Sequence, residues 1–277
     1  MTEPILVPPG GGELVGDSPE RRVEILSDEL RLHATWSRFG PHREGADLHV
    51  HRRHTDLFYV LEGELALRLG AEDRSVALPA GTLARLPPLV VHGFRNSSDA
   101  EVRYLNLHAP GQAFADYLRA LRDGRSFSYD QYPPPPDGGR PSTEAAIGTA
   151  RLAVELPGVR IELLGEVEEI AVAETRIAPG ALSPPHVHAR HVESLYVLEG
   201  EVALTAAGRD LRARPGSWLQ VPAGVPHSLA VDGSAAARFL DLHTPSCGFG
   251  RFLRGLSAAR SDDRLAALRA AFDQAPA

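Results

Sequence analysis

Ten of the chain's twelve histidines form five pairs whose members lie 135 or 137 residues apart. The pairs are His49 and His186, His51 and His188, His54 and His191, His92 and His227, and His108 and His243. A duplication that copied histidines together with their spacing copied a site as well as a scaffold. The offset changes by two residues between Gly63 and Gly81 of the first copy, which we interpret as a length change in one loop.

In the second copy the histidines accompany a glutamate at spacings that suit a metal site. His186 and His188 are two positions apart, so on a strand both side chains project from the same face. Glu193 lies an odd number of positions away, so a loop or bulge must intervene, and a turn at 222–224 leads to His227. Three imidazoles and one carboxylate suit a divalent transition metal: Fe, Mn, Ni, Cu, Co or Zn. Positions on such an ion stay open for substrate, water or dioxygen.

The first copy carries a similar donor set with departures from the second. Its members are His49, His51, Asp56 and His92. Asp56 is one methylene shorter than glutamate, which changes its reach. Leu89 replaces the turn glycine, which is unfavourable if that turn needs a positive φ. We predict one metal ion per domain, and the alternative is that the histidines are hydrogen-bonded core residues without metal.

These spacings resemble the two sequence motifs of the cupin superfamily, over about residues 23–256. The second copy departs from the family pattern at Val231, which stands in place of a final Asn. The first copy departs at Asp56, which stands in place of Glu, at Leu89, and at Gly45, to which the leading glycine is displaced. The chain resembles a bicupin of the quercetin dioxygenase-like kind, with both domains in one polypeptide. The resemblance implies two tandem jelly-roll (double-stranded β-helix) barrels that pack as an intramolecular pseudo-dimer. Further assembly into a homo-oligomer is left open.

Short apolar runs that alternate with polar residues predict a mainly β fold from Val23 onward. Apolar residues three and four apart predict one short α-helix after each barrel, at 113–121 and 249–256. Ser261 and Asp262 are N-cap candidates for a further helix. We predict an N-terminal arm at 1–20, a first barrel domain at 21–127, a Pro-rich linker at 128–150, a second barrel domain at 151–257 and a C-terminal helix at 258–277. Residues 5–7 of the arm could add an edge strand.

Two further histidine pairs have alternative interpretations. His54 and His191 are either solvated loop residues, which we favour, or partners of the metal ligands. His108 and His243 end the last strand of each copy. If that face lines the barrel, His243 and Asp241 relay protons beside the metal, and otherwise they cap the following turn. Glu193 and His243 are the predicted catalytic residues.

Composition excludes several classes of function. All 29 basic residues are arginine, so no lysine can form a Schiff base. The net charge of −7 is spread along the chain, which argues against nucleic-acid binding. We find no signal peptide and no apolar stretch long enough for a membrane span. The single cysteine, Cys247, favours a packing role and a cytoplasmic protein.

The predicted function is a metal-dependent dioxygenase of the quercetinase-like kind, which is what the resemblance implies. Its substrate would be a small oxygenated organic molecule, and Glu193 would double as a base. The cupin fold also carries other functions, so two alternatives stay open. One is a bicupin that binds or senses a small molecule without turnover, and the other is an oxygen-independent metal-dependent isomerase or decarboxylase.

Overall fold

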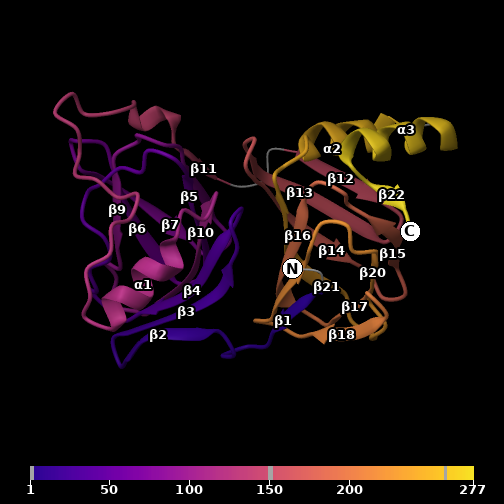
Figure 1. Ribbon diagram of the computed structural model, residues 1–277, viewed down its shortest axis with the longest axis horizontal. Coiled ribbons are helices and arrows are strands. Elements are labelled where there is room, and N and C mark those ends of the chain that lie inside the picture. The colour runs from indigo at the N-terminus through magenta and orange to yellow at the C-terminus, as the bar shows by residue number, and fades with distance from the viewer. Residues whose placement is uncertain (1–2, 149–151, 259–260) are drawn as a thin grey trace. The chain divides into compact units, whose positions relative to one another are not determined.

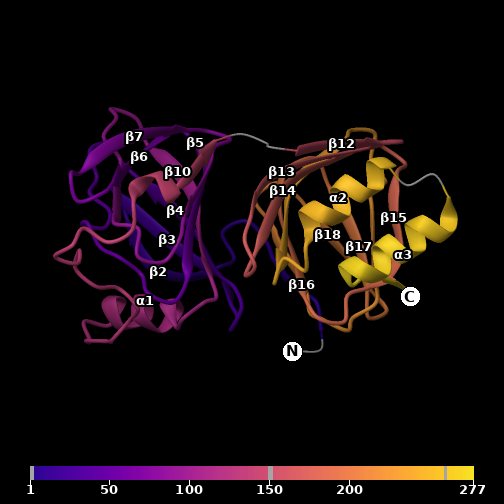
Figure 2. The same cartoon turned by 90° about the horizontal axis from the view of Figure 1, so that it is seen from above.

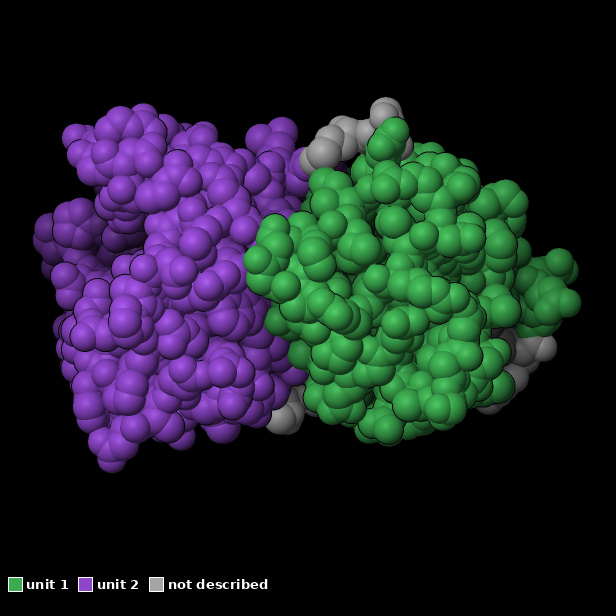
Figure 3. Space-filling view, turned by 90° about the horizontal axis from the view of Figure 1, so that it is seen from below, with its two compact units in different colours: residues 1–11, 150–277 green, residues 12–149 purple. Residues whose placement is uncertain are grey.

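The computed structural model describes residues 3–148, 152–258 and 261–277. The chain divides into two compact units, residues 12–149 and residues 1–11 with 150–277 (Figure 3). Parts of the predicted arm, linker, second domain and C-terminal helix, namely residues 1–2, 149–151 and 259–260, lie outside the described residues. Among the described residues, no helix has the length and apolar character needed to cross a membrane.

The unit of residues 12–149 is built from two antiparallel sheets (Figure 1). The larger has seven strands in the order β11-β8-β5-β10-β4-β3-β2, and the smaller has the order β7-β6-β9. The strands are β2 (Glu13–Ser18), β3 (Arg21–Asp28), β4 (His33–Phe39), β5 (Thr55–Glu62), β6 (Glu64–Leu69), β7 (Arg74–Pro79), β8 (Leu83–Leu86), β9 (His92–Arg95), β10 (Val102–Ala109) and β11 (Ala146–Gly148). Alternating apolar residues such as Val60, Leu67 and Leu86 are buried in its core.

The other unit repeats this arrangement. Its sheets have the orders β1-β19-β16-β21-β14-β13-β12 and β18-β17-β20-β15-β22. The strands are β1 (Ile5–Val7), β12 (Leu152–Leu156), β13 (Val159–Glu166), β14 (Ala171–Ile177), β15 (Leu182–Val187), β16 (Val192–Glu199), β17 (Val202–Ala206), β18 (Arg209–Ala213), β19 (Trp218–Val221), β20 (His227–Ala230), β21 (Ala237–Thr244) and β22 (Ala275–Pro276). The predicted mainly β fold of two jelly-roll barrels is confirmed.

Segments outside the repeated motifs complete the sheets. The expected edge strand at residues 5–7 forms, and it pairs with β19 of the second barrel. The linker is more than an extended connector, because Ala146–Gly148 pairs with β8 of the first barrel and Tyr132 pairs with Val50. The main-chain polar groups of β19 and β8 therefore gain hydrogen-bond partners on one side.

The predicted helices form at α1 (Phe114–Arg122), α2 (Phe249–Ala258) and α3 (Asp262–Phe272). Ser261 is the N-cap of α3 and its side chain accepts a hydrogen bond from the Arg264 main-chain N–H, as its position predicted. α2 lies along β12 and β13 (Figure 2). Phe252 and Phe272 are buried in the core that α2 and α3 share with these strands.

Candidate metal centres

The predicted donor set of the second unit converges at one point. The strand register places His186 of β15 opposite His227 of β20, and His188 follows directly after β15. The expected loop then leads into β16, which carries Glu193. Glu193 Oε2 lies 2.8 Å from His227 Nε2, 3.2 Å from His188 Nε2 and 3.8 Å from His186 Nε2. All four side chains are buried.

Main-chain carbonyls fix the orientation of these three imidazoles. The Nδ1 atoms of His186, His188 and His227 donate to the carbonyls of Pro184 (2.8 Å), Asp273 (2.9 Å) and Val225 (2.9 Å). A carbonyl oxygen only accepts, so Nδ1 carries the proton and the Nε2 lone pair is free. Three free nitrogen lone pairs and one carboxylate, all within 4.8 Å of one another, fit a divalent metal ion.

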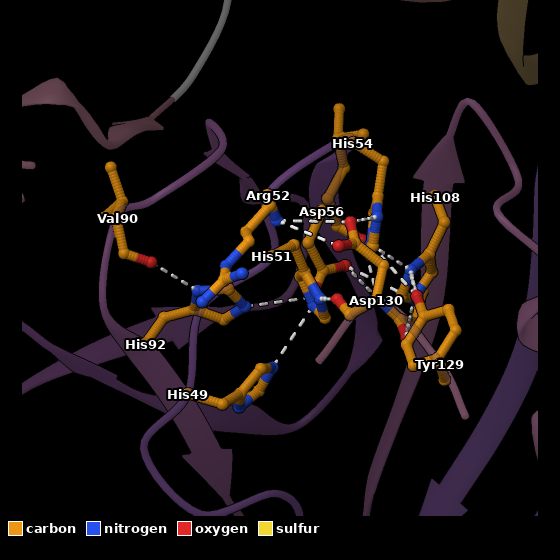
Figure 4. A network of polar contacts seen from close by, with 12 residues as sticks. His49, His51, Arg52, His54, Asp56, Val90, His92, His108, Tyr129 and Asp130 are labelled. Atoms are coloured by element: carbon orange, nitrogen blue, oxygen red, sulfur yellow. Dashed lines mark hydrogen bonds and ion pairs between the residues drawn. The ribbon is translucent and has the colours of Figure 1, made fainter. Parts of the chain in front are cut away.

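The first unit repeats these contacts (Figure 4). His49 Nδ1 donates to the Asp47 carbonyl at 2.7 Å, and His92 Nδ1 donates to the Val90 carbonyl at 2.8 Å. His51 Nδ1 donates to the Asp130 carbonyl at 2.5 Å. The shorter Asp56 still reaches the group, because its Oδ2 lies 3.3 Å from His92 Nε2 and 3.7 Å from His51 Nε2. This donor set also fits a metal ion.

The turn before the last histidine ligand needs a positive φ, as expected. Gly224 has φ 80°, and Leu89 adopts the same left-handed region at φ 68°. Both main-chain N–H groups donate at 2.7 Å to the carbonyl of the second histidine ligand, His188 or His51. The turn therefore forms in both units, and the leucine carries conformational strain there.

The charges within each donor set suit metal binding. Burial favours the protonated form of Glu193, but the three imidazoles that face its carboxylate outweigh burial and hold the pKa of Glu193 well below its usual value. Burial also favours the protonated form of Asp56, but the interaction with His108, together with His51 and His92, outweighs burial and holds the pKa of Asp56 well below its usual value. Burial, assisted by the neighbouring imidazoles, lowers the pKa of His49 to about 3. An ionised carboxylate beside neutral imidazoles is the state that metal ligation requires.

The interpretation of His54 and His191 as solvated loop residues is wrong. Both side chains are buried. His54 Nδ1 lies 2.9 Å from Asp130 Oδ2, and His191 Nδ1 lies 3.1 Å from Asp273 Oδ2. Their Nε2 atoms contact the histidine that ends the last strand, at 2.8 Å for His108 in the first unit and 3.1 Å for His243 in the second. The segments that follow α1 and α3 carry Asp130 and Asp273, and they cover these loops and exclude water from them.

Asp130 and Asp273 are site residues that the sequence reasoning missed. The main-chain carbonyl of each orients a histidine ligand, and the carboxylate accepts main-chain N–H groups of the ligand loop, for example Arg53 at 2.8 Å and Arg190 at 2.6 Å. We call the segments that contain these aspartates, residues 129–132 and 272–276, the tails of the two units. Each tail pairs with the segment that carries the first two histidine ligands: Tyr132 with Val50, and Ala275 with Val187. The sequence contains a signal for these two residues: an aromatic residue followed by Asp and Gln occurs at 129–131 and again at 272–274.

Of the two alternatives for His108 and His243, the inward-facing one is correct, since both are buried. His108 Nε2 lies 2.9 Å from Asn106 Oδ1, whereas His243 Nε2 lies 3.3 Å from the Asp241 carboxylate. Burial lowers the pKa of His108 well below its usual value. Burial acts in the same direction on His243, but Asp241 and Glu193 outweigh it and raise the pKa of His243.

A cavity of about 190 Å³ reaches the donor set of the second unit. His186, His188 and Glu193 lie in its wall, together with Asp241 and His243. At matching strand positions the two barrels differ in side-chain size. Ile177 and Leu229 line the cavity, where the first barrel has Phe39 and Phe94. The two first-barrel rings lie 6.0 Å apart, in contact with the rings of Phe58 and Tyr104.

The chain is similar in sequence to curated proteins. It is 25% identical over 226 residues to quercetin 2,3-dioxygenase of Bacillus subtilis (strain 168), which covers 67% of this chain and 65% of that protein. It is 34% identical over 73 residues to germin-like protein subfamily 2 member 3 of Arabidopsis thaliana, which covers 24% of this chain and 33% of that protein. The chain thus spans less than two thirds of the length of these relatives.

Solved structures share its fold. The structure of a mutant of Bacillus subtilis oxalate decarboxylase that lacks residues 162–163 of that enzyme matches 86% of this chain and 76% of its own chain, with a TM-score of 0.62 at 16% identity. The formate complex of Lactobacillus farciminis oxalate decarboxylase matches 87% and 86% with a TM-score of 0.61 at 15% identity. The sequence pattern of the cupin domain matches residues 35–108 and 173–243, together just over half of the chain. The protein therefore belongs to the cupin family, as a bicupin with two barrels in one polypeptide.

Proposed function

We propose that this bicupin is a metal-dependent dioxygenase of the quercetinase-like type that acts on a small oxygenated organic substrate. The observation that carries the proposal is the cavity that reaches the second donor set, because a substrate there can contact the ligands directly. The sequence likeness to a quercetin 2,3-dioxygenase supports the same reaction type. The single cysteine, which forms no disulfide, suits a cytoplasmic location.

His186, His188, Glu193 and His227 would hold the metal of the active centre, and His49, His51, Asp56 and His92 would hold a second ion. The candidates are Fe, Mn, Ni, Cu, Co and Zn, since nitrogen and carboxylate donors suit them all. When bound, a redox-capable member of this group would supply Lewis acidity and an electron path to dioxygen.

The residues of the second site handle protons around the bound substrate. The Glu193 carboxylate is ionised, so its oxygen can accept the proton of a substrate hydroxyl or enol. His243 Nε2 faces the Asp241 carboxylate at 3.3 Å, and this pair can hold or pass on a proton at the cavity wall. Apolar side chains around the cavity keep bulk water away from these groups.

Metal analysis combined with oxygen uptake tests the proposal. Wild type reconstituted with Fe, Mn, Ni, Cu or Co should bind about two ions per chain and consume oxygen with a flavonol, diketone or enediol. His188→Ala should lose one ion and at least about 100-fold of the oxygen uptake, whereas His51→Ala should lose one ion and keep most of the uptake. His42→Ala, at an exposed histidine that pairs with Asp99, is the matched control. No oxygen uptake with any of these metals and substrates, nor with a small hydroxylated aryl acid, would refute the dioxygenase.

A further inference from the structure

The cavity of the second unit is small for a polycyclic substrate. Its volume is about 190 Å³. A cavity of about 150 Å³ holds benzene, and pockets for drug-sized molecules are about 300 Å³ or larger. The space therefore fits one ring with a short substituent, and a three-ring flavonol does not fit inside it.

The walls are largely apolar and rich in aromatic rings. Phe239, Phe249, Phe252 and Phe272 line the cavity together with aliphatic residues of β12, β13 and β15. Phe249 and Phe272 lie 5.2 Å apart, and Phe252 and Phe272 lie 4.5 Å apart in a stacked arrangement. Rings in this arrangement accept another flat apolar ring at low cost, because their faces and edges pack in offset or T-shaped pairs.

Arg269 gives the cavity a positive charge on the tail side. It lies in the last turn of α3, is half-buried, and lines the cavity together with Gln274. Within the described ranges its guanidinium makes no ion pair or side-chain hydrogen bond. A guanidinium beside an apolar cavity is complemented by a carboxylate, which it binds through charge-assisted and often bidentate hydrogen bonds.

Thr175 contributes a buried hydroxyl to the wall of the same cavity. Its side chain is buried, with 4% of its surface exposed, and its Oγ1 has no hydrogen-bond partner among the described residues. In the first barrel the matching Ser37 bonds to the hydroxyl of Tyr104, but the second barrel has Phe239 in place of that tyrosine. A buried hydroxyl left in this way costs free energy that a polar ligand group can recover.

We propose that the second site takes a single-ring organic acid, with its ring among the phenylalanines, its carboxylate on Arg269 and a hydroxyl near Thr175. This proposal rests on the proposed function in one respect: both place the substrate in the same cavity. It narrows the substrate class to small hydroxylated aryl acids and removes intact flavonols from it.

Calorimetric titration of the metal-loaded protein tests this assignment. The probes are 3-(4-hydroxyphenyl)propionate, its alcohol analogue 3-(4-hydroxyphenyl)propan-1-ol, 3-phenylpropionate and quercetin. The hydroxylated acid should bind about tenfold more tightly than the alcohol, and more tightly than quercetin. Arg269→Gln should abolish the preference for the acid, and Arg269→Lys should retain part of it. Arg264→Gln, at an exposed arginine of the same helix, should leave it unchanged.

A second variant addresses the hydroxyl. Thr175→Val should weaken the hydroxylated acid about fivefold and leave 3-phenylpropionate unchanged. Equal affinities for acid and alcohol, tighter binding of quercetin, no binding of the acid, or equal effects of Arg269→Gln and Arg264→Gln would each overturn the assignment. Oxygen uptake separates the two proposals. If the acid binds but no oxygen is consumed, the dioxygenase function is refuted and the assignment of the acid stands. If oxygen is consumed with quercetin and the acid does not bind, the assignment of the acid is refuted and the dioxygenase function stands.

Discussion

The two candidate metal centres have matching ligand contacts and different surroundings. In both, three Nδ1 atoms donate to carbonyls and a carboxylate faces the Nε2 atoms. Around the first, larger or more polar side chains stand at matching positions: Phe94 for Leu229, Tyr104 for Phe239, and Tyr129 for Phe272. In addition, the amide of Asn106 stands where the second has the Asp241 carboxylate. The comparison teaches that ligand geometry alone does not make a reaction site, because access and proton-handling groups come from the neighbours.

The polar network of the first centre, which Figure 4 shows, has more hydrogen-bond contacts between its side chains than that of the second. Tyr129 Oη lies 2.6 Å from His108 Nδ1 and 3.0 Å from His54 Nε2, and Asn106 connects His108 to Asp56. In the second centre Phe272 has no hydroxyl, and Asp241 brings a negative charge in place of an amide. The first centre is therefore suited to holding an ion and the second to exchanging protons with a ligand.

The largest effect should come from His33, which occupies the strand position that Ala171 has in the second barrel. Burial, with Arg119 nearby, lowers the pKa of His33 to about 3. The unfolded chain binds a proton there near pH 6.5 that the folded chain does not, so stability present above pH 6.5 is lost as the pH falls toward 3. The loss from this residue is about 4 kcal/mol.

Urea unfolding of full-length wild type and His33→Ala at several pH values between 4 and 7.5 measures this contribution. The variant should be less stable at pH 7.5 because of the cavity it leaves, but its stability should fall less on acidification. His42→Ala, at an exposed site, should follow the wild-type curve. Parallel curves for wild type and His33→Ala would contradict the prediction.

Filling the second cavity tests whether it is the substrate site. Leu229→Phe introduces the residue that the first barrel has at Phe94, and should lower affinity for the hydroxylated acid and oxygen uptake about 100-fold. Bound metal should stay at the wild-type amount, which mass spectrometry checks. The reverse change, Phe94→Leu, should leave activity at wild-type level. Full activity of Leu229→Phe would remove the cavity as the substrate site.

The tail aspartates should affect metal retention at their own centres. Asp273→Ala removes the carboxylate that holds the Arg190 N–H and His191, and should weaken the second ion about tenfold in chelator competition. Asp130→Ala should act in the same way on the first ion. Asp263→Ala, at an exposed position of α3, is the control. Unchanged ion retention in both alanine variants would show that the tails only cover the loops.

The smallest effect concerns the turn before the last ligand. Leu89→Gly relieves the left-handed strain and should raise the free energy of unfolding by about 0.5 to 1 kcal/mol. Gly224→Ala should lower it by about 1 kcal/mol through the backbone alone, since a Cβ there meets no atom within 4 Å. Thermal and urea unfolding measure both. A destabilised Leu89→Gly would mean that packing of the leucine outweighs its strain.

Much of the fold was predictable from local pattern. Alternating residues gave the strands, the apolar spacing gave α1 and α2, and Ser261 marked the start of α3. The sheets that β1 and β11 join could not be predicted in full. β1 pairs with β19 of the second barrel and β11 pairs with β8 of the first, and the sequence of a short edge strand does not specify which sheet it joins. The contact of Asp130 with His51 was not predictable either, because Asp130 lies in a Pro-rich segment whose sequence predicts only an extended linker.

Residue types and their repeat determined that two sets of three histidines and one carboxylate exist, because ligand chemistry and the two-residue period of a strand are local properties. Tertiary structure alone decided the rest. It shows that Asp130 and Asp273 orient His51 and His188, that His54 and His191 are buried, and that the side chains around the second donor set leave space for a ligand beside Glu193. Burial and free volume depend on contacts between residues far apart in the chain, so no local pattern encodes them.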